Sequence, residues 1–98
     1  MLNIEKKNED NKLIITLEGR LDTTTAPQLE EETKSFDNVT ELIFDFKKLE
    51  YISSAGLRVL LASQKIMNKQ GSMKVINVNE EVKEIFEVTG FVDILTIE

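Results

Sequence analysis

Two adjacent hydroxyl side chains, Ser53 and Ser54, lie between two different apolar patterns. They follow the pair Tyr51–Ile52 and precede apolar residues with helical spacing, which predicts a strand, a tight loop and a helix beginning close to Ser54. A serine there can cap the helix and contribute on the order of 1 kcal/mol. The unpaired N–H groups of a helix N-terminus also favour a negative group, so the same hydroxyl could carry a regulatory phosphate. Spacing alone favours the cap, and the two roles are compatible.

A second polar loop contains Asp22, Thr23, Thr24 and Thr25. Sites in open α/β sheets form beyond the carboxyl ends of the strands, in the loops that lead into helices. Because the strands before the two loops are expected to be neighbours, we expect Asp22 and Ser54 to share one surface. Asp22 could equally be a turn residue that binds its own backbone.

Charged residues near these loops also have two interpretations. Arg58, one turn into the predicted helix, is either a solvated helix residue or a charge that pairs with a partner or with a phosphate on Ser54. The acidic run Glu30–Glu32 is interpreted as a solvated helix face near a helix N-terminus, rather than as a binding patch.

The composition excludes several kinds of chemistry. The absence of histidine and cysteine removes the usual zinc and copper ligands, and it also rules out a Ser-His-Asp hydrolase. Ser54 therefore has no general base of ordinary pKa, and no glycine-rich phosphate loop indicates a nucleotide site. A formal net charge of −6 disfavours nucleic-acid binding. We expect no metal and no cofactor.

The chain of 98 residues is expected to form a single domain over residues 1–98. No apolar run approaches the roughly 20 residues of a membrane span, and residues 1–10 lack the apolar stretch of a secretory signal. Without cysteine there is no disulfide framework, and the cytoplasm is the expected compartment.

The apolar patterns predict an α/β fold in the order β-β-α-β-α-β-α-β, with a mixed sheet of four to five strands and three helices. The alternation of Leu13, Ile15 and Leu17 indicates that one sheet face stays wet and that the helices lie mainly on the other. Gly19 is expected to end the second strand, and Asp45 to sit at a rim or accept backbone donors. The expected strands are residues 2–6, 13–17, 39–46, 73–78 and 92–97, and the expected helices begin near residues 25, 54 and 79.

Besides Ser54, five residues are expected to form the helix caps. Thr25 is the predicted N-cap of the first helix, and Gln28 completes a capping box with it. Gly71 is a predicted left-handed cap at the end of the longest helix. Asn79 is expected to cap the last helix and Gly90 to close it.

Four segments occur in an order typical of one family. They are Gly19-Arg20-Leu21-Asp22 with Thr25-Ala26-Pro27, Leu42-Ile43-Phe44-Asp45, Tyr51-Ile52-Ser53-Ser54-Ala55-Gly56-Leu57, and Phe86 with Thr89-Gly90-Phe91. They resemble the STAS domains, specifically bacterial anti-sigma factor antagonists. The family motif is usually Asp-Ser-(Ser/Thr)-Gly, and the serine after the Asp is phosphorylated by a partner kinase. That serine falls on Ser54 here, while Ser53 holds the Asp position and is the alternative phosphorylation site.

The resemblance implies a binding module and not an enzyme. Unphosphorylated, the domain would sequester an anti-sigma factor that is also a serine kinase, and so release a sigma factor. The kinase would bind the ATP, and a serine phosphatase would reset the switch. A second hypothesis is a non-phosphorylated STAS scaffold or assembly subunit of a larger signalling or transporter complex. The expected partner-binding residues are Asp22, Thr23, Thr24, Ser53, Ser54, Gly56 and Arg58.

Overall fold

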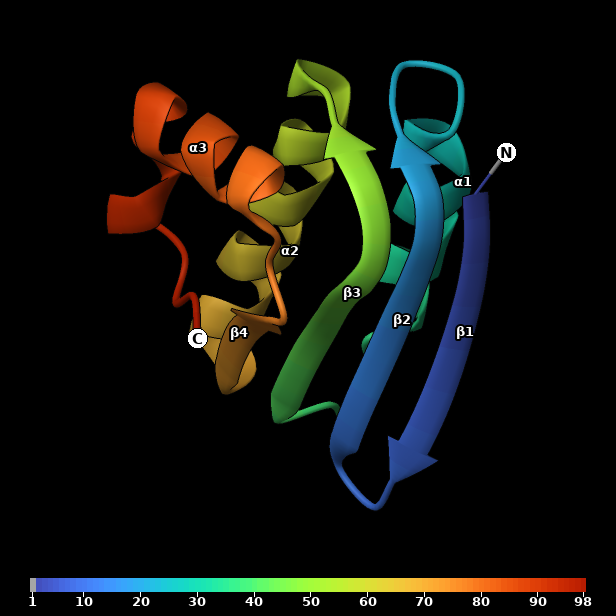
Figure 1. The fold of residues 1–98 in the computed structure, drawn as a ribbon. Coiled ribbons are helices and arrows are strands. Elements are labelled where there is room, and N and C mark those ends of the chain that lie inside the picture. Colours follow the sequence, from blue (N-terminus) through green and yellow to red (C-terminus); the bar gives the residue numbers. More distant parts are fainter. Residues whose placement is uncertain (1) are drawn as a thin grey trace.

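The computed structural model describes residues 2–98. The strands are β1 (Leu2–Glu9), β2 (Lys12–Leu21), β3 (Glu41–Ile52) and β4 (Ser72–Ile76); the α-helices are α1 (Ala26–Glu32), α2 (Ser54–Gln70) and α3 (Glu80–Thr89); and the short 3-10 helices are η1 (Thr33–Ser35) and η2 (Phe91–Asp93). The strands form one mixed sheet in the order β1-β2-β3-β4 (Figure 1). The β1–β2 pair is antiparallel, and the β2–β3 and β3–β4 pairs are parallel. The predicted fold class is confirmed.

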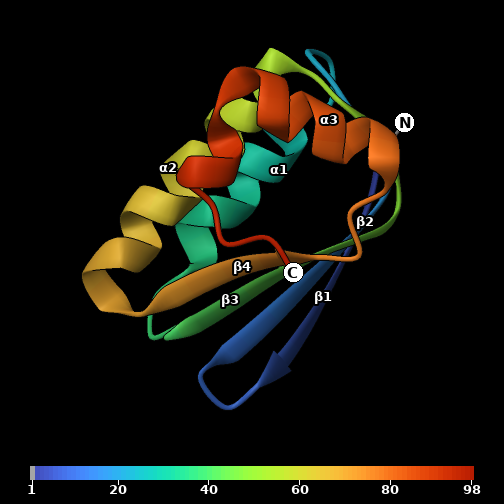
Figure 2. The ribbon, with the colours of Figure 1, turned by 60° about the vertical axis from the view of Figure 1, so that its left-hand side comes forward.

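The three α-helices lie on one face of the sheet, and the other face is left open (Figure 2). This follows from the alternation in β2, where Leu13, Ile15 and Leu17 are buried while Ile14 and Thr16 stay partly exposed. Apolar side chains on one strand face must be covered, and α-helices with an apolar stripe cover them. The hydrophobic core therefore lies between the sheet and the helical layer.

Aromatic side chains of β3 and α3 fill the centre of this core. Phe44 and Phe46 are fully buried with ring centroids 6.1 Å apart, and Phe46 lies 6.3 Å from the ring of Phe86. Asp45 lies between the two β3 rings in sequence, and its carboxylate accepts hydrogen bonds from Lys47 N and Asn77 Nδ2, both at 3.0 Å. The prediction that Asp45 accepts backbone donors is thus confirmed.

Gly19 was predicted to end the second strand, but β2 continues beyond it. It has a φ of +110°, and the register of the β2–β3 pair shifts between Gly19 and Arg20. A glycine with positive φ at such a shift is typical of a β-bulge. The strand continues to Leu21, which pairs with Ile52 at the end of β3. The loop that starts at Asp22 therefore lies beside the end of β3.

Gly71 follows α2, but it is not the left-handed cap that was predicted. Its φ is 173°, an extended conformation that any residue can adopt. The glycine is needed for another reason, because a Cβ at this position would collide with the backbone of Thr40. Thr40 lies at the entry to β3, so the glycine allows α2 to pass close to that strand.

The last helix has the ends that its sequence predicted. The Asn79 side chain accepts a hydrogen bond from Val82 N at 2.8 Å, and Gly90 closes α3 in the left-handed conformation with a φ of +81°.

Among residues 2–98, no helix has both the length and the apolar character needed to cross a membrane.

The final predicted strand, residues 92–97, is mostly absent. After Gly90 the chain enters η2, and Leu95 N bonds to Phe91 O at 2.8 Å. Only an isolated parallel bridge between Ile97 and Val75 of β4 remains of the expected pairing. The helical hydrogen bonds of η2 use the backbone groups that a longer strand would have needed.

Candidate functional site

The loops after β2 and β3 lie side by side at one end of the sheet (Figure 1). Leu21 and Ile52 are register partners, and Ser53 N donates to Leu21 O at 2.9 Å. Parallel strands end at the same edge, so this pairing holds the two loops together. The structure brings the Asp22 and Ser54 loops to one surface, as the sequence had predicted.

Helix α2 begins at Ser54, and its N-cap position is occupied by Ser53, one residue earlier than predicted. Ser53 has an extended backbone, with a φ of −100° and a ψ of 176°, and its carbonyl accepts the first helical hydrogen bond from Leu57 N at 3.0 Å. Its side chain makes no capping hydrogen bond. Ser54 is therefore the first helical residue and not the cap, and its side chain is exposed. The first-turn N–H groups of α2, which lack intrahelical acceptors, lie beside it.

The two serine hydroxyls differ in their access to solvent. The Ser53 Oγ is buried and has no hydrogen-bond partner among the described residues, whereas the Ser54 side chain is exposed. A nucleophilic hydroxyl must reach the reacting phosphorus atom of a nucleotide held by another protein. In this conformation only the Ser54 side chain offers that access.

Gly56 is buried, which contradicts its predicted place among the residues that contact a partner. A Cβ on Gly56 would lie 2.7 Å from Leu21 Cγ and 2.9 Å from Ile52 Cγ1. The first turn of α2 thus packs directly on the ends of β2 and β3. Gly56 positions Ser54 by allowing this close approach.

Asp22 organises its own loop. Its Oδ1 accepts hydrogen bonds from Thr24 Oγ1 at 2.7 Å, from Thr24 N at 3.0 Å and from Thr25 N at 3.2 Å. Its side chain is half-buried, and the turn interpretation describes it best. The Thr24 hydroxyl, although exposed, is occupied by the same carboxylate.

These hydrogen bonds lower the pKa of Asp22 from its ordinary value of 3.8. The Thr24 hydroxyl is the largest cause, and the backbone N–H groups of Thr24 and Thr25 add to it, while desolvation opposes the shift. Donors that point at a carboxylate favour its ionised form. Asp22 therefore stays charged while it holds the loop.

The predicted capping box at Thr25 and Gln28 does not form. Thr25 occupies the N-cap position of α1, but its Oγ1 donates to Arg20 O and accepts from Asp22 N, both at 2.8 Å. Gln28 Nε2 instead donates to Leu2 O at 2.9 Å and ties α1 to β1. In place of the local cap, the Thr25 side chain bonds within its own loop and the Gln28 side chain makes a tertiary hydrogen bond.

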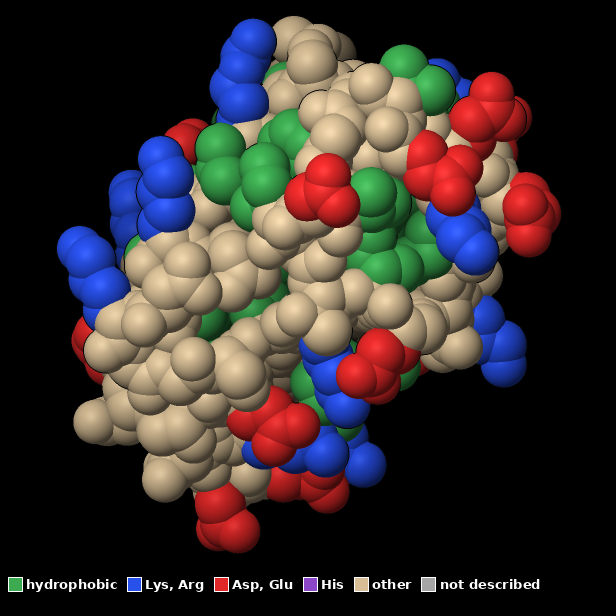
Figure 3. Space-filling view, turned by 90° about the vertical axis from the view of Figure 1, so that its left-hand side faces the viewer, with side chains coloured by type: hydrophobic (Ala, Val, Ile, Leu, Met, Phe, Trp, Pro, Cys, Tyr) green, Lys and Arg blue, Asp and Glu red, His purple; other side chains and the backbone are tan. Residues whose placement is uncertain are grey.

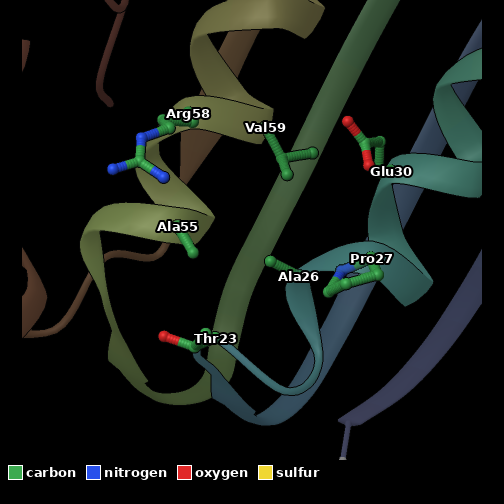
Figure 4. Close-up of a pocket in the computed structure, with 7 residues that line it drawn as sticks. All are labelled: Thr23, Ala26, Pro27, Glu30, Ala55, Arg58 and Val59. Carbon is green, nitrogen blue, oxygen red and sulfur yellow. The ribbon is translucent and has the colours of Figure 1, made fainter.

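A shallow groove of about 210 Å³ runs between α1 and α2, and Ala55, the residue after Ser54, is part of its lining (Figure 4). Its apolar part is formed by small or aliphatic side chains, while Arg58 on α2 and Glu30 on α1 stand on opposite sides of it. Arg58 points away from α1 and is exposed. The lining residues are Thr23, Ala26, Pro27, Glu30, Ala55, Arg58 and Val59. The groove thus offers a partner an apolar floor and one charge of each sign.

The STAS domain model matches residues 3–98 of this sequence. The chain belongs to the STAS domain family. It is 31% identical over 98 residues to the anti-sigma-B factor antagonist of Bacillus subtilis, which covers 98% of this chain and 90% of that protein. It is also 36% identical over 91 residues to BtrV of Bordetella bronchiseptica, named as a candidate anti-sigma factor antagonist, with 90% of this chain and 78% of that protein covered.

The fold of this STAS domain is similar to that of the Bacillus cell fate determinant SpoIIAA in its phosphorylated form. The TM-score is 0.76 at 18% identity, covering 98% of this chain and 91% of that chain. The resemblance to the STAS family that the sequence motifs suggested is confirmed.

An aromatic and a cationic residue beside the loops were missed by sequence reasoning. Arg20 and Tyr51 are register partners at the ends of β2 and β3, and the Arg20 guanidinium lies 4.5 Å from the centre of the Tyr51 ring. Arg20 Nε is also 4.0 Å from Asp22 Oδ2. A correct strand register would have revealed this pair, because each residue lies two positions before its loop.

The predicted site residues of the STAS domain fall into three groups. The exposed ones are Thr23, Thr24, Ser54 and Arg58, the half-buried ones are Asp22 and Ser53, and the buried one is Gly56. Within residues 2–98 no three acidic side chains are grouped in a way that could hold a metal ion. The exposed group marks the surface available to a partner.

Proposed function

We propose that this STAS domain is an anti-sigma factor antagonist, and that phosphorylation of Ser54 switches its binding to an anti-sigma factor. The names of the Bacillus subtilis and Bordetella bronchiseptica relatives support the first part. The SpoIIAA structure, described as a phosphorylated form, supports the second, because it shows that a protein of this fold carries such a modification.

The observation that carries the proposal is the position of Ser54. Its exposed side chain is the first residue of α2, and its neighbour Ala55 lines the groove that contains Arg58 and Thr23. A modification of Ser54 therefore changes the charge of this surface without disturbing a buried side chain.

A phosphate on Ser54 adds about −1.5 to −2 charges to this surface. Inside the domain the free N–H groups at the start of α2 stabilise those charges, so the fold survives the modification. The same charges must be desolvated when a partner covers the surface, which weakens binding. The switch acts on the complex and not on folding.

Ser54 is preferred over Ser53 because of access. The Ser53 hydroxyl is buried, and the Ser53 backbone N–H donates to Leu21 O at 2.9 Å. A kinase would reach this hydroxyl only after the end of β3 had separated from β2. The Ser54 hydroxyl needs no such rearrangement.

The proposed partner is an anti-sigma factor that is itself a serine kinase and supplies the ATP, with a serine phosphatase reversing the reaction. Arg58 fits the binding of a carboxylate on that partner, because it is exposed and, within the described residues, takes part in no ion pair. Glu30 on the opposite side of the groove would meet a cation. The STAS domain acts in this scheme by binding and performs no catalysis.

Calorimetry with the anti-sigma factor kinase of the same genome tests the proposal. Ser54→Asp should fold normally and bind at least about tenfold more weakly, because it places a charge in the interface. Ser54→Ala should bind like the unmodified protein, and Ser53→Ala serves as the matched control. Equal affinities for Ser54→Asp and Ser54→Ala would contradict a charge switch at this residue.

A further inference from the structure

A second surface, on α3 and the turn after it, has no role in the function proposed above. Among residues 2–98, the large hydrophobic side chains that are exposed are Val88 at 80%, Ile94 at 48% and Val92 at 39%. Val88 lies in the last turn of α3, Val92 lies in η2, and Ile94 follows η2 directly. Scattered apolar residues are normal on a protein surface, but a local concentration marks an interaction site.

This surface also has a groove with a distinct lining. A depression of about 370 Å³ is lined by Ile85 and Val88 in the company of Glu81, Glu84 and Thr89. We define these five residues as the α3 surface; Val92 lines a different depression, together with Val78 and Lys83, and is not part of it. On the side of the molecule that carries α3, hydrophobic side chains reach the surface in patches with acidic side chains among and beside them (Figure 3).

The charges of α3 indicate that its partner is positively charged. The helix carries Glu80, Glu81, Glu84 and Glu87 against Lys83 alone, a difference of three negative charges. A second copy of the chain, docked symmetrically, would place these carboxylates against each other, which is unfavourable. The same repulsion disfavours a membrane of anionic lipids. A partner with basic groups beside aliphatic ones satisfies both features of the surface.

We propose that the α3 surface binds a basic amphipathic helix of a partner protein, with its aliphatic residues against Ile85 and Val88 and its Lys or Arg residues against Glu81 and Glu84. Apolar anchors spaced by three and four residues would match a helical face, as in other helix-in-groove complexes. The α3 surface lies on the far side of α2 from α1, so it is separate from the groove beside Ser54 (Figure 1). The two proposals can therefore fail independently.

Nitrogen-15 NMR of the full chain with two synthetic helical peptides tests the proposal. Both peptides carry the same leucine pattern, but one is flanked by lysines and the other by glutamates. The lysine peptide should shift amide signals of α3 and η2 in a saturable way and lose affinity as salt is added. The glutamate peptide should bind at least about tenfold more weakly.

Variants locate the contact. Val88→Asp should weaken the lysine peptide at least about tenfold, and Glu84→Lys should weaken it in the same direction. Glu5→Lys, the same charge change on the exposed strand β1, is the matched control and should leave the affinity nearly unchanged. Val88 is 80% exposed, so its variant should keep the native melting temperature.

Three results would overturn the proposal. The first is equal binding of the two peptides, and the second is a set of shifts centred on the Asp22 and Ser54 loops. The third is concentration-dependent dimerisation of the chain that Val88→Asp abolishes, which would assign the surface to a second copy.

Discussion

Replacing Gly56 by alanine tests how closely α2 must approach the sheet. A glycine-to-alanine change in a helix normally stabilises it, by about 1 kcal/mol. Here the added Cβ would lie 2.7 Å from Leu21 Cγ and 2.9 Å from Ile52 Cγ1, distances that the buried side chains cannot accommodate without moving. Overpacking of this kind costs about 1–3 kcal/mol. We therefore expect Gly56→Ala to lower the free energy of unfolding by about 1 kcal/mol, the opposite of the helix-propensity effect.

Urea denaturation measures this change, and a double-mutant cycle with Leu21→Ala assigns it. Leu21→Ala removes Leu21 Cγ and Cδ2, which meet the new Cβ, and leaves Ile52 Cγ1 in place, so its cost should be smaller in the Gly56→Ala background by at least about 0.5 kcal/mol. Because the first turn must shift, Gly56→Ala should also slow phosphorylation of Ser54. A variant that is more stable than the unmodified protein, shows no coupling to Leu21 and is phosphorylated at the same rate would refute the packing argument.

Three further predictions concern Asp22, Asn79 and Arg58. Because the pKa of Asp22 is lowered in the folded state, its ionised form stabilises the fold above pH 3.8, and this stability is lost as the pH falls through the folded-state pKa. Urea titrations from about pH 7 to about pH 2 should therefore show that the free energy of unfolding falls less for Asp22→Asn than for the unmodified protein. Asn79→Ala should destabilise the domain by about 1–2 kcal/mol in the same assay, because it removes the cap on Val82 N and the bond from Asn79 Nδ2 to Leu49 O at 2.9 Å. Arg58→Glu should weaken binding to the anti-sigma factor in calorimetry while its stability stays within about 0.5 kcal/mol, since its side chain is exposed; unchanged affinity would move the interface elsewhere.

The fold could be predicted largely because its patterns are local. The alternation of Leu13, Ile15 and Leu17 was enough to show which face of the sheet is covered. The start of α2 was predicted close to Ser54, to within one residue, since the helical spacing begins immediately after it. Asn79 and Gly90 were also correct, because a side-chain cap and a left-handed end depend on neighbouring residues.

The errors arose where a distant residue decides the conformation. Gly71 is required by the backbone of Thr40, which lies far away in sequence, so the local pattern suggested a left-handed cap instead. Gln28 bonds to Leu2 O, 26 positions away, and this tertiary bond replaces its part in the predicted capping box.

Within the candidate site, the residue types indicated the surface but not the burial of each member. Gly56 matched a motif and was therefore assigned to partner binding, yet its contact with Leu21 buries it. Ser53 was placed beside Ser54 in the same group, yet its hydroxyl is buried where the two strands end. Such differences depend on three-dimensional packing that no spacing rule encodes.

Locating the phosphate by mass spectrometry, after incubation with the anti-sigma factor kinase and ATP, tests the proposed switch most directly. The exposed position of Ser54 at the start of α2 predicts a single phosphate on Ser54, and none on the Ser54→Ala variant. Phosphate on Ser53 alone would show that the buried hydroxyl is the target, and phosphate on neither residue would contradict the switch and favour an unphosphorylated scaffold.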